Sequence, residues 1–324
     1  MELQRIGLVG AGKQMRHFLL PCILQLPAVQ VVAICSKKGD TAQALSAEFS
    51  HINTVSSIQR LIDNEEITSI VAAADPQVHF EVASACLAKQ KRCLVEKPPC
   101  IGLTHLRRLA EAAPSDCDNV SAGMNFRFAP MVVSLNQILH SLNAIPAFAR
   151  VRFATKFPES KLGRYETKEE AFLYEFGIHA IDLGCHLFGM TRLSRHKWYR
   201  MTHGPAVRCG LEGSETDCEV DIEITSVPTK FDFTIEVVTR AGAHISLQNN
   251  RALIIEHSQS DRLAPQVGDL SYRESFEWPI RRNSFEQNGY LPMLLNFLAH
   301  RVSTSLNSLV PVYTIIETLL SDIR

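Results

Sequence analysis

Short apolar runs rich in β-branched residues alternate with segments of helical character over the first third of the chain. Strands are predicted at residues 5–9, 29–36, 67–75 and 92–99, with a helix at 80–90. Strands that alternate with helices predict an α/β fold built on a parallel, doubly wound sheet. In such sheets, ligands bind beyond the carboxyl ends of the strands.

This alternation stops at about residue 122. An amphipathic helix is predicted at residues 129–142, a strand at 147–157 and a polar, turn-rich loop at 158–170. Period-two alternation follows at residues 218–227 and 230–248. Two helices are predicted to close the chain, at residues 288–303 and 311–323. The loop is expected to border the substrate pocket. The period-two segments predict an antiparallel sheet with one covered face. If its other face is apolar, that face is the expected oligomer surface.

The chain has 324 residues, of which 46% are hydrophobic and 21% charged, and its formal net charge is −1. These values indicate a globular protein of about two domains. Near-neutral charge without a long basic run argues against nucleic-acid or membrane-surface partners. The opening residues, MELQRIGLVG, lack the pattern of a signal peptide, and no apolar run approaches the roughly 20 residues of a membrane span. A cytoplasmic location and a small-molecule substrate are therefore expected.

Nine cysteines are scattered along the chain without a CxxC pair. The odd number and the lack of a secretion signal favour reduced thiols, packed as small hydrophobes, over a disulfide framework. No cluster of His and Cys has the spacing of metal ligands, so no metal site is predicted.

A glycine-containing turn follows the first predicted strand, and a second strand follows within the roughly 30 residues of a βαβ unit. Gly10 would permit the tight turn, Gly12 would let a pyrophosphate approach the backbone, and the N–H groups opening the next helix would face the phosphates. Met15 stands where the third glycine of the fingerprint belongs. The alternative is an ordinary strand-to-helix turn. The residues expected to contact a dinucleotide here are Gly10, Ala11, Gly12, Lys13, Gln14 and Met15.

The choice of cofactor depends on the end of the second predicted strand. An NAD site has an acidic residue there, which accepts a hydrogen bond from the ribose 2′-OH. This sequence has Ser36, Lys37 and Lys38 instead. One hydroxyl and two ammonium groups suit a 2′-phosphate, so NADP(H) is predicted in preference to NAD. The alternative for the two lysines is a solvated loop.

Further candidate contact residues stand at the ends of the third and fourth predicted strands. They are expected beside the nicotinamide half of the dinucleotide, because the carboxyl ends of parallel strands form the ligand edge of the sheet. His79 is interpreted as packing against the cofactor or capping the following helix, rather than as titrating in catalysis. The residues of this group are Ala74, Asp75, Pro76, His79, Glu96 and Lys97.

Four segments resemble, in this order and spacing, the glucose–fructose oxidoreductase and inositol dehydrogenase (Gfo/Idh/MocA) family: GLVGAGKQM, DPQVHFEVASACLAKQKRCLVEKP, GMNFRFAP and EFGIHAIDLGCHLFG. The resemblance implies a Rossmann domain, placed at residues 1–122. It also implies a substrate-binding and oligomerisation α/β domain on a large, mostly antiparallel sheet, placed at residues 123–324. Through that sheet a homodimer or homotetramer is expected. Family members transfer hydride between NAD(P) and a hydroxyl-bearing carbon of a sugar, cyclitol or nucleotide sugar.

The resemblance also implies roles for single residues. Lys97, in the Glu-Lys-Pro motif, corresponds to a lysine beside the nicotinamide and the substrate. Asn125 and Arg127 are candidate cofactor or substrate contacts, with plain loop residues as the alternative. Independently of the resemblance, oxidation of a carbinol needs a base whose pKa lies near the working pH, which histidine supplies. A lysine ammonium would stabilise the developing alkoxide or carbonyl.

Two acid–histidine pairs compete for the acid–base role. Glu175, His179, Asp182 and His186 fall at i, i+4, i+7 and i+11, the spacing of one helical stripe. The family's Asp-x-Gly-x-His-x-x-Asp frame selects His179, with Glu175 in place of the usual aspartate. Glu175 would orient the imidazole or bind a substrate hydroxyl. Asp182 would hold the other imidazole nitrogen or anchor the helix, and His186 is interpreted as structural. The alternative is a helix with satisfied buried polar groups and no catalysis.

Three functions compete at this point. The first is an NADP(H)-dependent oxidoreductase acting on a sugar-like alcohol or ketone. The second is an NADPH-dependent imine reductase of a biosynthetic pathway, in which His179 would donate a proton. The third is a non-catalytic dinucleotide-binding sensor, which would need neither Lys97 nor His179.

Overall fold

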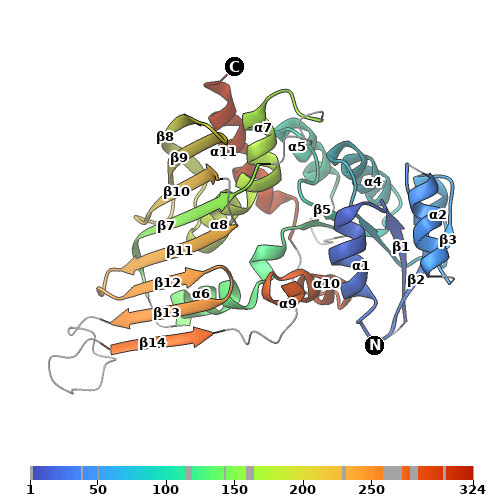
Figure 1. Ribbon diagram of the computed structural model, residues 1–324, viewed down its shortest axis with the longest axis horizontal. Helices are drawn as coiled ribbons and strands as arrows, with labels where there is room; N and C mark the ends of the chain where they lie inside the picture. The colour runs from blue at the N-terminus through green and yellow to red at the C-terminus, as the bar shows by residue number, and fades with distance from the viewer. Residues whose placement is uncertain are drawn as a thin grey trace. The chain divides into compact units, whose positions relative to one another are not determined.

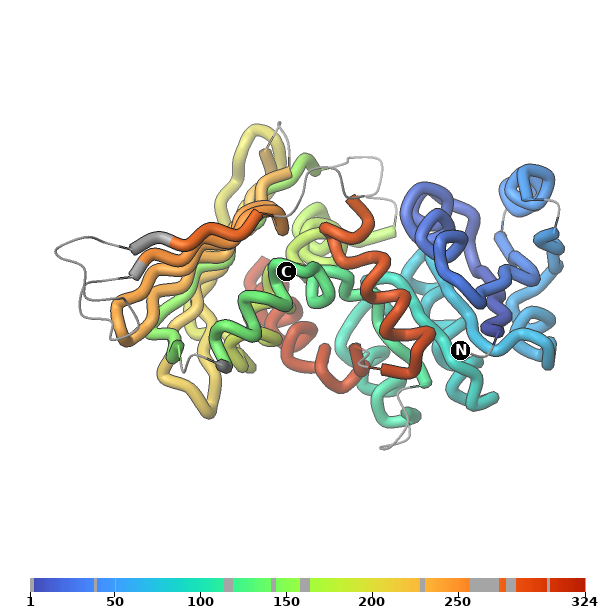
Figure 2. The backbone as a smooth tube through the Cα atoms, turned by 90° about the horizontal axis from the view of Figure 1, so that it is seen from below, coloured from blue at the N-terminus to red at the C-terminus, as the bar shows by residue number. Residues whose placement is uncertain are grey.

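The computed structural model describes residues 3–37, 39–49, 51–113, 119–141, 144–157, 164–227, 231–257, 272–277, 284–301 and 304–323. The chain divides into two compact units (Figures 1 and 2). The first unit comprises Met1–Asn125 and Gly289–Val310, and the second comprises Phe126–Asn288 and Pro311–Arg324. The first division lies close to the boundary expected after residue 122, but residues 289–310, expected in the second domain, pack in the first unit.

The first unit contains a six-stranded sheet in the order β3-β2-β1-β4-β5-β6, and all its pairings are parallel. The strands are β1 (Gln4–Val9), β2 (Val29–Cys35), β3 (Asn53–Thr54), β4 (Ser69–Ala72), β5 (Arg92–Glu96) and β6 (Val120–Gly123). The strand order reverses beside β1, which is the switch point where doubly wound sheets bind ligands. The predicted parallel, doubly wound sheet is confirmed.

The helices of the first unit fill the connections between strands and close the unit. They are the π-helix η1 (Met15–Leu19), α1 (Leu20–Ile23), α2 (Gly39–Glu48), α3 (Ile58–Ile62), α4 (Pro76–Ala88), α5 (Leu103–Ala112), α10 (Tyr290–Leu298) and the 3₁₀-helix η5 (Asn307–Leu309). The central strands are apolar along their length because both faces of the sheet are covered. Ile6, Leu8, Ile70 and Val71 are fully buried, and burying each such side chain contributes roughly 1.5–3 kcal/mol.

The helix α10 returns to the first unit and packs against η1 and α1. The Arg92 guanidinium, at the start of β5, lies 4.6 Å from the centre of the Phe297 ring and donates a hydrogen bond to the Phe297 carbonyl oxygen. The backbone N–H of Thr304 donates to the Ser121 hydroxyl at 3.1 Å. These contacts hold the segment in the first unit. Its position in the sequence had suggested the second domain.

The second unit contains an eight-stranded sheet in the order β14-β13-β12-β11-β7-β10-β9-β8. Only β7 and β10 pair in parallel, and the other pairings are antiparallel, which confirms the predicted mostly antiparallel sheet. The strands are β7 (Pro146–Thr155), β8 (Arg192–Met201), β9 (Gly204–Glu212), β10 (Glu219–Ser226), β11 (Asp232–Thr239), β12 (His244–Gln248), β13 (Ala252–His257) and β14 (Tyr272–Glu277).

Helices cover one face of this sheet (Figure 2). The helical elements of the second unit are the 3₁₀-helix η2 (Asn125–Phe128), which begins at the last residue of the first unit, α6 (Pro130–Ser141), α7 (Lys168–Phe172), the π-helix η4 (Leu173–Gly177), α8 (Ile178–Phe188), α9 (Ser284–Gln287) and α11 (Val310–Ser321). Buried and less buried positions alternate strictly in β10 and β11, as expected for one covered face. Gly177 allows a close approach, since a Cβ there would come within 3.0 Å of Ile224.

The helix α7 begins inside the segment predicted as a loop. Residues 158–163 of that prediction lie outside the described residues. Lys168 opens α7 because the Thr167 hydroxyl accepts a hydrogen bond from the Glu170 N–H at 3.0 Å. A Thr-x-x-Glu sequence at this point is a helix-start signal, and it shortens the loop to the residues before Thr167.

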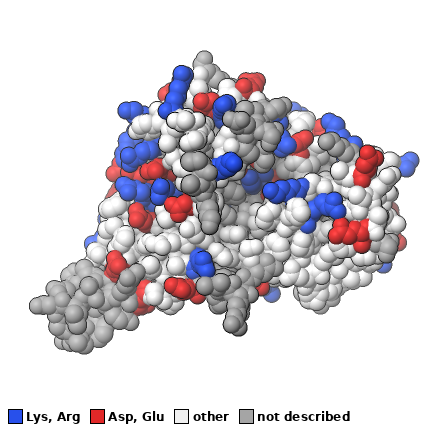
Figure 3. All heavy atoms as spheres, viewed as in Figure 1, with Lys and Arg blue, Asp and Glu red and all other residues white. Residues whose placement is uncertain are grey.

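The other face of the sheet is polar from β11 to the edge strand β8. Arg152, on β7, pairs with Asp232 at 3.1 Å and with Glu223 at 3.4 Å, and Arg195, on β8, pairs with Asp221 at 2.7 Å. Figure 3 shows Lys and Arg side chains interspersed with Asp and Glu over β8, β9 and β10. The expectation of an oligomer surface assumed an apolar face, and these strands present ion pairs instead. A homodimer or homotetramer through this sheet stays a prediction.

The cysteines of the described residues are free thiols, and all of them except the half-buried Cys185 are buried. Burial raises the pKa of Cys22 to about 12, and burial together with the Asp221 carboxylate raises that of Cys209 to about 12. Thiols with such pKa values are poor nucleophiles, so these side chains act as small hydrophobes. None of the described helices is long and apolar enough to cross a membrane.

Candidate active site

The turn after β1 is built around Gly10. Its N–H donates to the Cys35 carbonyl oxygen at 2.8 Å, and the Ala73 N–H donates to the Val9 carbonyl oxygen at 2.8 Å. Gly10 has a φ of 90°, and a Cβ on it would lie 2.1 Å from the Ala73 oxygen. Because no L side chain fits there, the fold itself requires this glycine.

The fold itself does not require a glycine at position 12. A Cβ on Gly12 would meet no atom within 4 Å, and its backbone lies outside the left-handed region. The Arg16 N–H donates to the Gly12 carbonyl oxygen at 3.0 Å, so the helix starts here. Open space beside a helix start is what a diphosphate needs to approach the backbone in dinucleotide-binding folds. Ala11 is buried, whereas Lys13 is exposed.

Met15, which replaces the third glycine, is fully buried. The chain forms a π-helix from Met15 to Leu19, so the wider turn begins at the position of the absent third glycine. At the end of β2, the Ser36 hydroxyl lies 3.0 Å from the Thr41 hydroxyl at the start of α2. Lys37 is exposed, and Lys38 lies outside the described residues.

His79 joins the ends of two strands. Its Nε2 accepts a hydrogen bond from the Ala74 N–H at 2.8 Å, so Nδ1 carries the proton and donates to the Pro98 carbonyl oxygen at 2.9 Å. The side chain is 1% exposed, and its packing against a cofactor stays a prediction. Asp75 precedes the helix α4, and Pro76 occupies its first position, where the missing N–H of proline is harmless.

Glu96 is a buried carboxylate at the end of β5. Its Oε1 accepts from the Gln14 amide at 3.2 Å, and its Oε2 accepts from the Lys97 N–H at 3.2 Å. The Gln14 amide also donates to the Tyr290 hydroxyl at 3.1 Å. Lys97 is half-buried and precedes a cis peptide bond to Pro98. The first unit therefore brings the Glu-Lys-Pro motif and the glycine turn together.

The segment with the two acid–histidine pairs is not one regular α-helix. Leu173–Gly177 forms the π-helix η4, and α8 begins at Ile178. Glu175 therefore lies in a π turn and His179 in a regular α-helix, and both side chains are buried. His179 and Asp182 are buried on α8, whereas His186 is exposed.

The His179 imidazole stacks on aromatic rings of the second unit. Its ring centre lies 4.6 Å from that of Phe126, with an angle of 24° between the planes, and 6.1 Å from that of Phe153. Phe126 comes from η2 and Phe153 from β7. The side chain is 6% exposed, so these rings fix its orientation, as an acid–base group requires.

Asp182, on α8, pairs with Arg127, on η2. Its carboxylate accepts hydrogen bonds from Nε of Arg127 at 2.9 and 3.1 Å, and Nη2 lies 2.5 Å from Oδ1. Burial alone would lower the pKa of Arg127, but the Asp182 carboxylate outweighs burial and raises it. Arg127 is thus an ion-pair partner, and Asn125, which opens η2, is buried.

The Glu175 carboxylate accepts a hydrogen bond from the Tyr165 hydroxyl at 3.0 Å, and Arg164 lies 3.7 Å from the same oxygen. Burial and the Glu175 carboxylate raise the pKa of Tyr165, so its hydroxyl stays protonated as the donor. Sequence reasoning missed Tyr165 and Tyr290. Tyr165 lies in the predicted loop, and the position of Tyr290 after an Asn-Gly turn is a weak signal.

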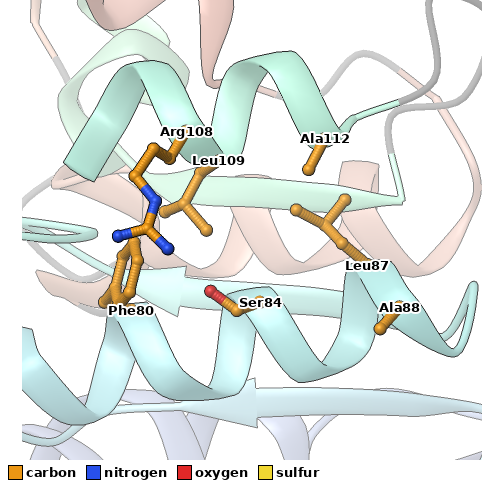
Figure 4. A pocket seen from close by; sticks show the side chains of 7 residues that line it. All are labelled: Phe80, Ser84, Leu87, Ala88, Arg108, Leu109 and Ala112. Atoms are coloured by element: carbon orange, nitrogen blue, oxygen red, sulfur yellow. The ribbon is translucent and has the colours of Figure 1, made fainter. Parts of the chain in front are cut away.

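A groove between α4 and α5 is lined by side chains of these two helices (Figure 4). The Arg108 guanidinium stands over the Phe80 ring, 5.7 Å from its centre, and the lining includes none of the residues predicted for the site. Among the residues that the structure describes, no group of three or more His, Cys, Asp or Glu side chains is arranged to hold a metal ion.

Comparison with known proteins agrees with this geometry. The family model GFO_IDH_MocA, an oxidoreductase family with an NAD-binding Rossmann fold, matches residues 4–124. Residues 4–124 thus form a domain of the Gfo/Idh/MocA oxidoreductase family. The likeness in fold extends further. The crystal structure of a dehydrogenase from Chromobacterium violaceum has a TM-score of 0.87 and 25% sequence identity, covering 99% of this chain and 96% of that one.

Curated relatives match the chain over somewhat more than half of its length. The uncharacterized oxidoreductase YdgJ of Escherichia coli K12 is 31% identical over 190 residues, 57% of this chain and 54% of that protein. The scyllo-inositol 2-dehydrogenase (NADP(+)) IolW of Bacillus subtilis 168 is 23% identical over 193 residues, 58% of this chain and 52% of that protein. The chain thus spans about half the length of the curated relatives it matches.

Proposed function

We propose that this Gfo/Idh/MocA protein is an NADP(H)-dependent oxidoreductase that transfers hydride to or from a carbinol or ketone carbon of a sugar, cyclitol or nucleotide sugar. The observation that carries the proposal is the buried His179 imidazole, held against Phe126 on a helix that also carries Asp182. A ring with a fixed orientation suits proton transfer at a substrate hydroxyl.

The residues of the first unit fit a dinucleotide, because Gly12 leaves its Cβ space open beside a helix start. When bound, the dinucleotide accepts or donates hydride at its nicotinamide ring. Ser36 and the lysines after it support NADP(H), and the name of the relative IolW supports the same choice. The residues proposed to hold the cofactor are Gly10, Ala11, Gly12, Lys13, Gln14, Met15, Ser36, Lys37, Lys38, Ala74, Asp75, Pro76, His79, Glu96, Lys97, Asn125 and Arg127.

Two side chains of this chain are proposed to act on the substrate oxygen, one by taking its proton and the other by stabilising its charge. In the oxidation, the carbinol carbon loses hydride, an imidazole nitrogen of His179 takes the hydroxyl proton, and a C=O bond forms. The Lys97 ammonium stabilises the developing charge on that oxygen. Glu175 accepts a hydrogen bond from a further substrate hydroxyl. Asp182 acts as a positioning residue, since it holds Arg127 and thereby the η2 segment that carries Phe126.

The decisive experiment is a panel of sugars, cyclitols, nucleotide sugars and cyclic imines, followed by absorbance at the reduced-nicotinamide band. Turnover of an alcohol or ketone supports the proposal, and turnover of imines alone replaces it with imine reduction. Binding of NADPH no tighter than NADH would refute the cofactor choice.

Single variants then test the two reacting residues. Lys97→Ala and His179→Ala are expected to abolish turnover and to leave NADPH binding nearly unchanged. The matched controls are Lys89→Ala, at an exposed lysine of the first unit, and His186→Ala, at an exposed histidine on the same helix as His179. Both controls are expected to keep wild-type turnover. Unchanged turnover in Lys97→Ala or His179→Ala would contradict the proposed site.

A further inference from the structure

Tyr290 is the point where the chain re-enters the first unit. It opens α10 directly after Gly289, whose φ of 80° turns the chain into the helix. The Tyr290 ring packs against Phe18, with ring centres 5.3 Å apart. Its hydroxyl reaches the Gln14 amide, two residues after Gly12. A residue nearly 300 positions along the chain thus contacts the helix start of the cofactor turn.

The Gln14 amide connects Tyr290 to the Glu-Lys-Pro motif. An amide nitrogen carries two hydrogens, and here Nε2 lies 3.1 Å from the Tyr290 hydroxyl and 3.2 Å from Oε1 of Glu96. The other Glu96 oxygen accepts from the Lys97 N–H at 3.2 Å. One continuous path of hydrogen bonds therefore runs from Tyr290 to the backbone of Lys97, all within the first unit.

Burial makes this path sensitive to the loss of one member. Glu96 is 4% exposed, and a buried carboxylate needs its donors to stay ionised and in place. Burial and the Glu96 carboxylate raise the pKa of Tyr290, so the phenol stays neutral and its lone pair keeps accepting from Gln14. A phenylalanine would keep the packing on Phe18 but lose the acceptor that fixes the Gln14 amide.

We propose that Tyr290 is a positioning residue of the dinucleotide site, which holds Gln14 and, through Glu96, the backbone at Lys97. This inference rests on the proposed function, because it assigns the network to cofactor binding and hydride transfer. The hydroxyl contributes through hydrogen bonds alone, so its removal is expected to weaken NADPH binding and lower kcat by about two- to tenfold, the range for one hydrogen bond.

The test compares Tyr290→Phe with Tyr199→Phe, at an exposed tyrosine on β8 of the second unit. NADPH affinity is measured by cofactor fluorescence, stability by thermal unfolding, and backbone protection by hydrogen exchange without cofactor. In Tyr290→Phe, we expect weaker NADPH binding, an almost unchanged Tm and faster exchange of the Lys97 amide. In Tyr199→Phe, all three are expected to match the wild type.

A double-mutant cycle shows whether Tyr290 acts through Gln14. Gln14→Met removes the amide, so Tyr290→Phe added to it is expected to change NADPH affinity no further, whereas independent effects multiply. Multiplying effects, or wild-type affinity and exchange in Tyr290→Phe, overturn the inference. If the wild-type protein binds neither NADPH nor NADH, the proposed function fails, while the exchange of the Lys97 amide still reports on the network itself.

Discussion

Asp182→Ala tests the buried ion pair that joins α8 to η2. The Asp182 side chain is 1% exposed and that of Arg127 is 9% exposed. Removing the carboxylate leaves the guanidinium buried without a counter-charge, which costs about 3–5 kcal/mol. In a unit of this size, 1 kcal/mol corresponds to about 2–4 °C in Tm. The Tm of the second unit is therefore expected to fall by roughly 6–20 °C, measured by circular dichroism and checked by urea unfolding.

The control is Asp232→Ala, which removes an exposed partner of Arg152 in the same unit and is expected to cost less than about 1 kcal/mol. Replacing both members of the buried pair, Arg127→Met with Asp182→Leu, should recover most of the loss, because no buried charge remains. If Asp182→Ala loses no more than Asp232→Ala, or if the double variant is no more stable than Asp182→Ala, the reasoning from burial is refuted.

Three further predictions concern the first unit. Gly10→Ala is expected to prevent folding, because its Cβ would meet a backbone oxygen at 2.1 Å, whereas Gly12→Ala should keep the Tm and weaken NADPH binding. Circular dichroism measures the folding of both variants, and cofactor fluorescence measures their NADPH binding. Equal behaviour of the two variants would contradict the prediction. His79→Leu removes the partners of two backbone groups, so a loss of about 2–6 kcal/mol is expected in urea unfolding, and a loss below about 1 kcal/mol would count against it. Burial and the Arg92 cation lower the pKa of His300. The stabilisation from neutral His300 is therefore present above about pH 6.5 and lost as the pH falls through the folded pKa. Exposure keeps it well below about 1 kcal/mol, and His300→Asn should flatten this part of the stability–pH curve.

The order of helices and strands could be predicted from the sequence, because the burial of a strand determines which of its residues are apolar. The apolar runs of β1 and β4 and the strict alternation of β10 and β11 each reflect how many faces of a strand are covered. The two π-helices did not follow, since a single extra residue in a turn leaves the composition unchanged and only shifts which side chains share a face.

The candidate site was predictable where the chemistry is local in sequence. Gly10 and Glu96 stand at strand ends that the pattern itself defines, and the frame around His179 distinguished it from His186. Partners from distant segments were not predictable. Periodicity gives α10 an apolar face, but it does not say which surface receives that face, so the Tyr290 hydroxyl and its bond to Gln14 appear only in the folded chain.

The first unit is built from two separate segments of the chain, and this has a consequence for synthesis on the ribosome. The chain leaves this unit after Asn125 and returns at Gly289. At about 5–20 residues per second, the two pieces emerge roughly 8–33 s apart. During that interval the apolar surfaces of η1 and α1 that α10 will cover stay open. A nascent chain therefore completes its first unit only after residues 289–310 have been made, and an isolated version of that unit has to carry both pieces.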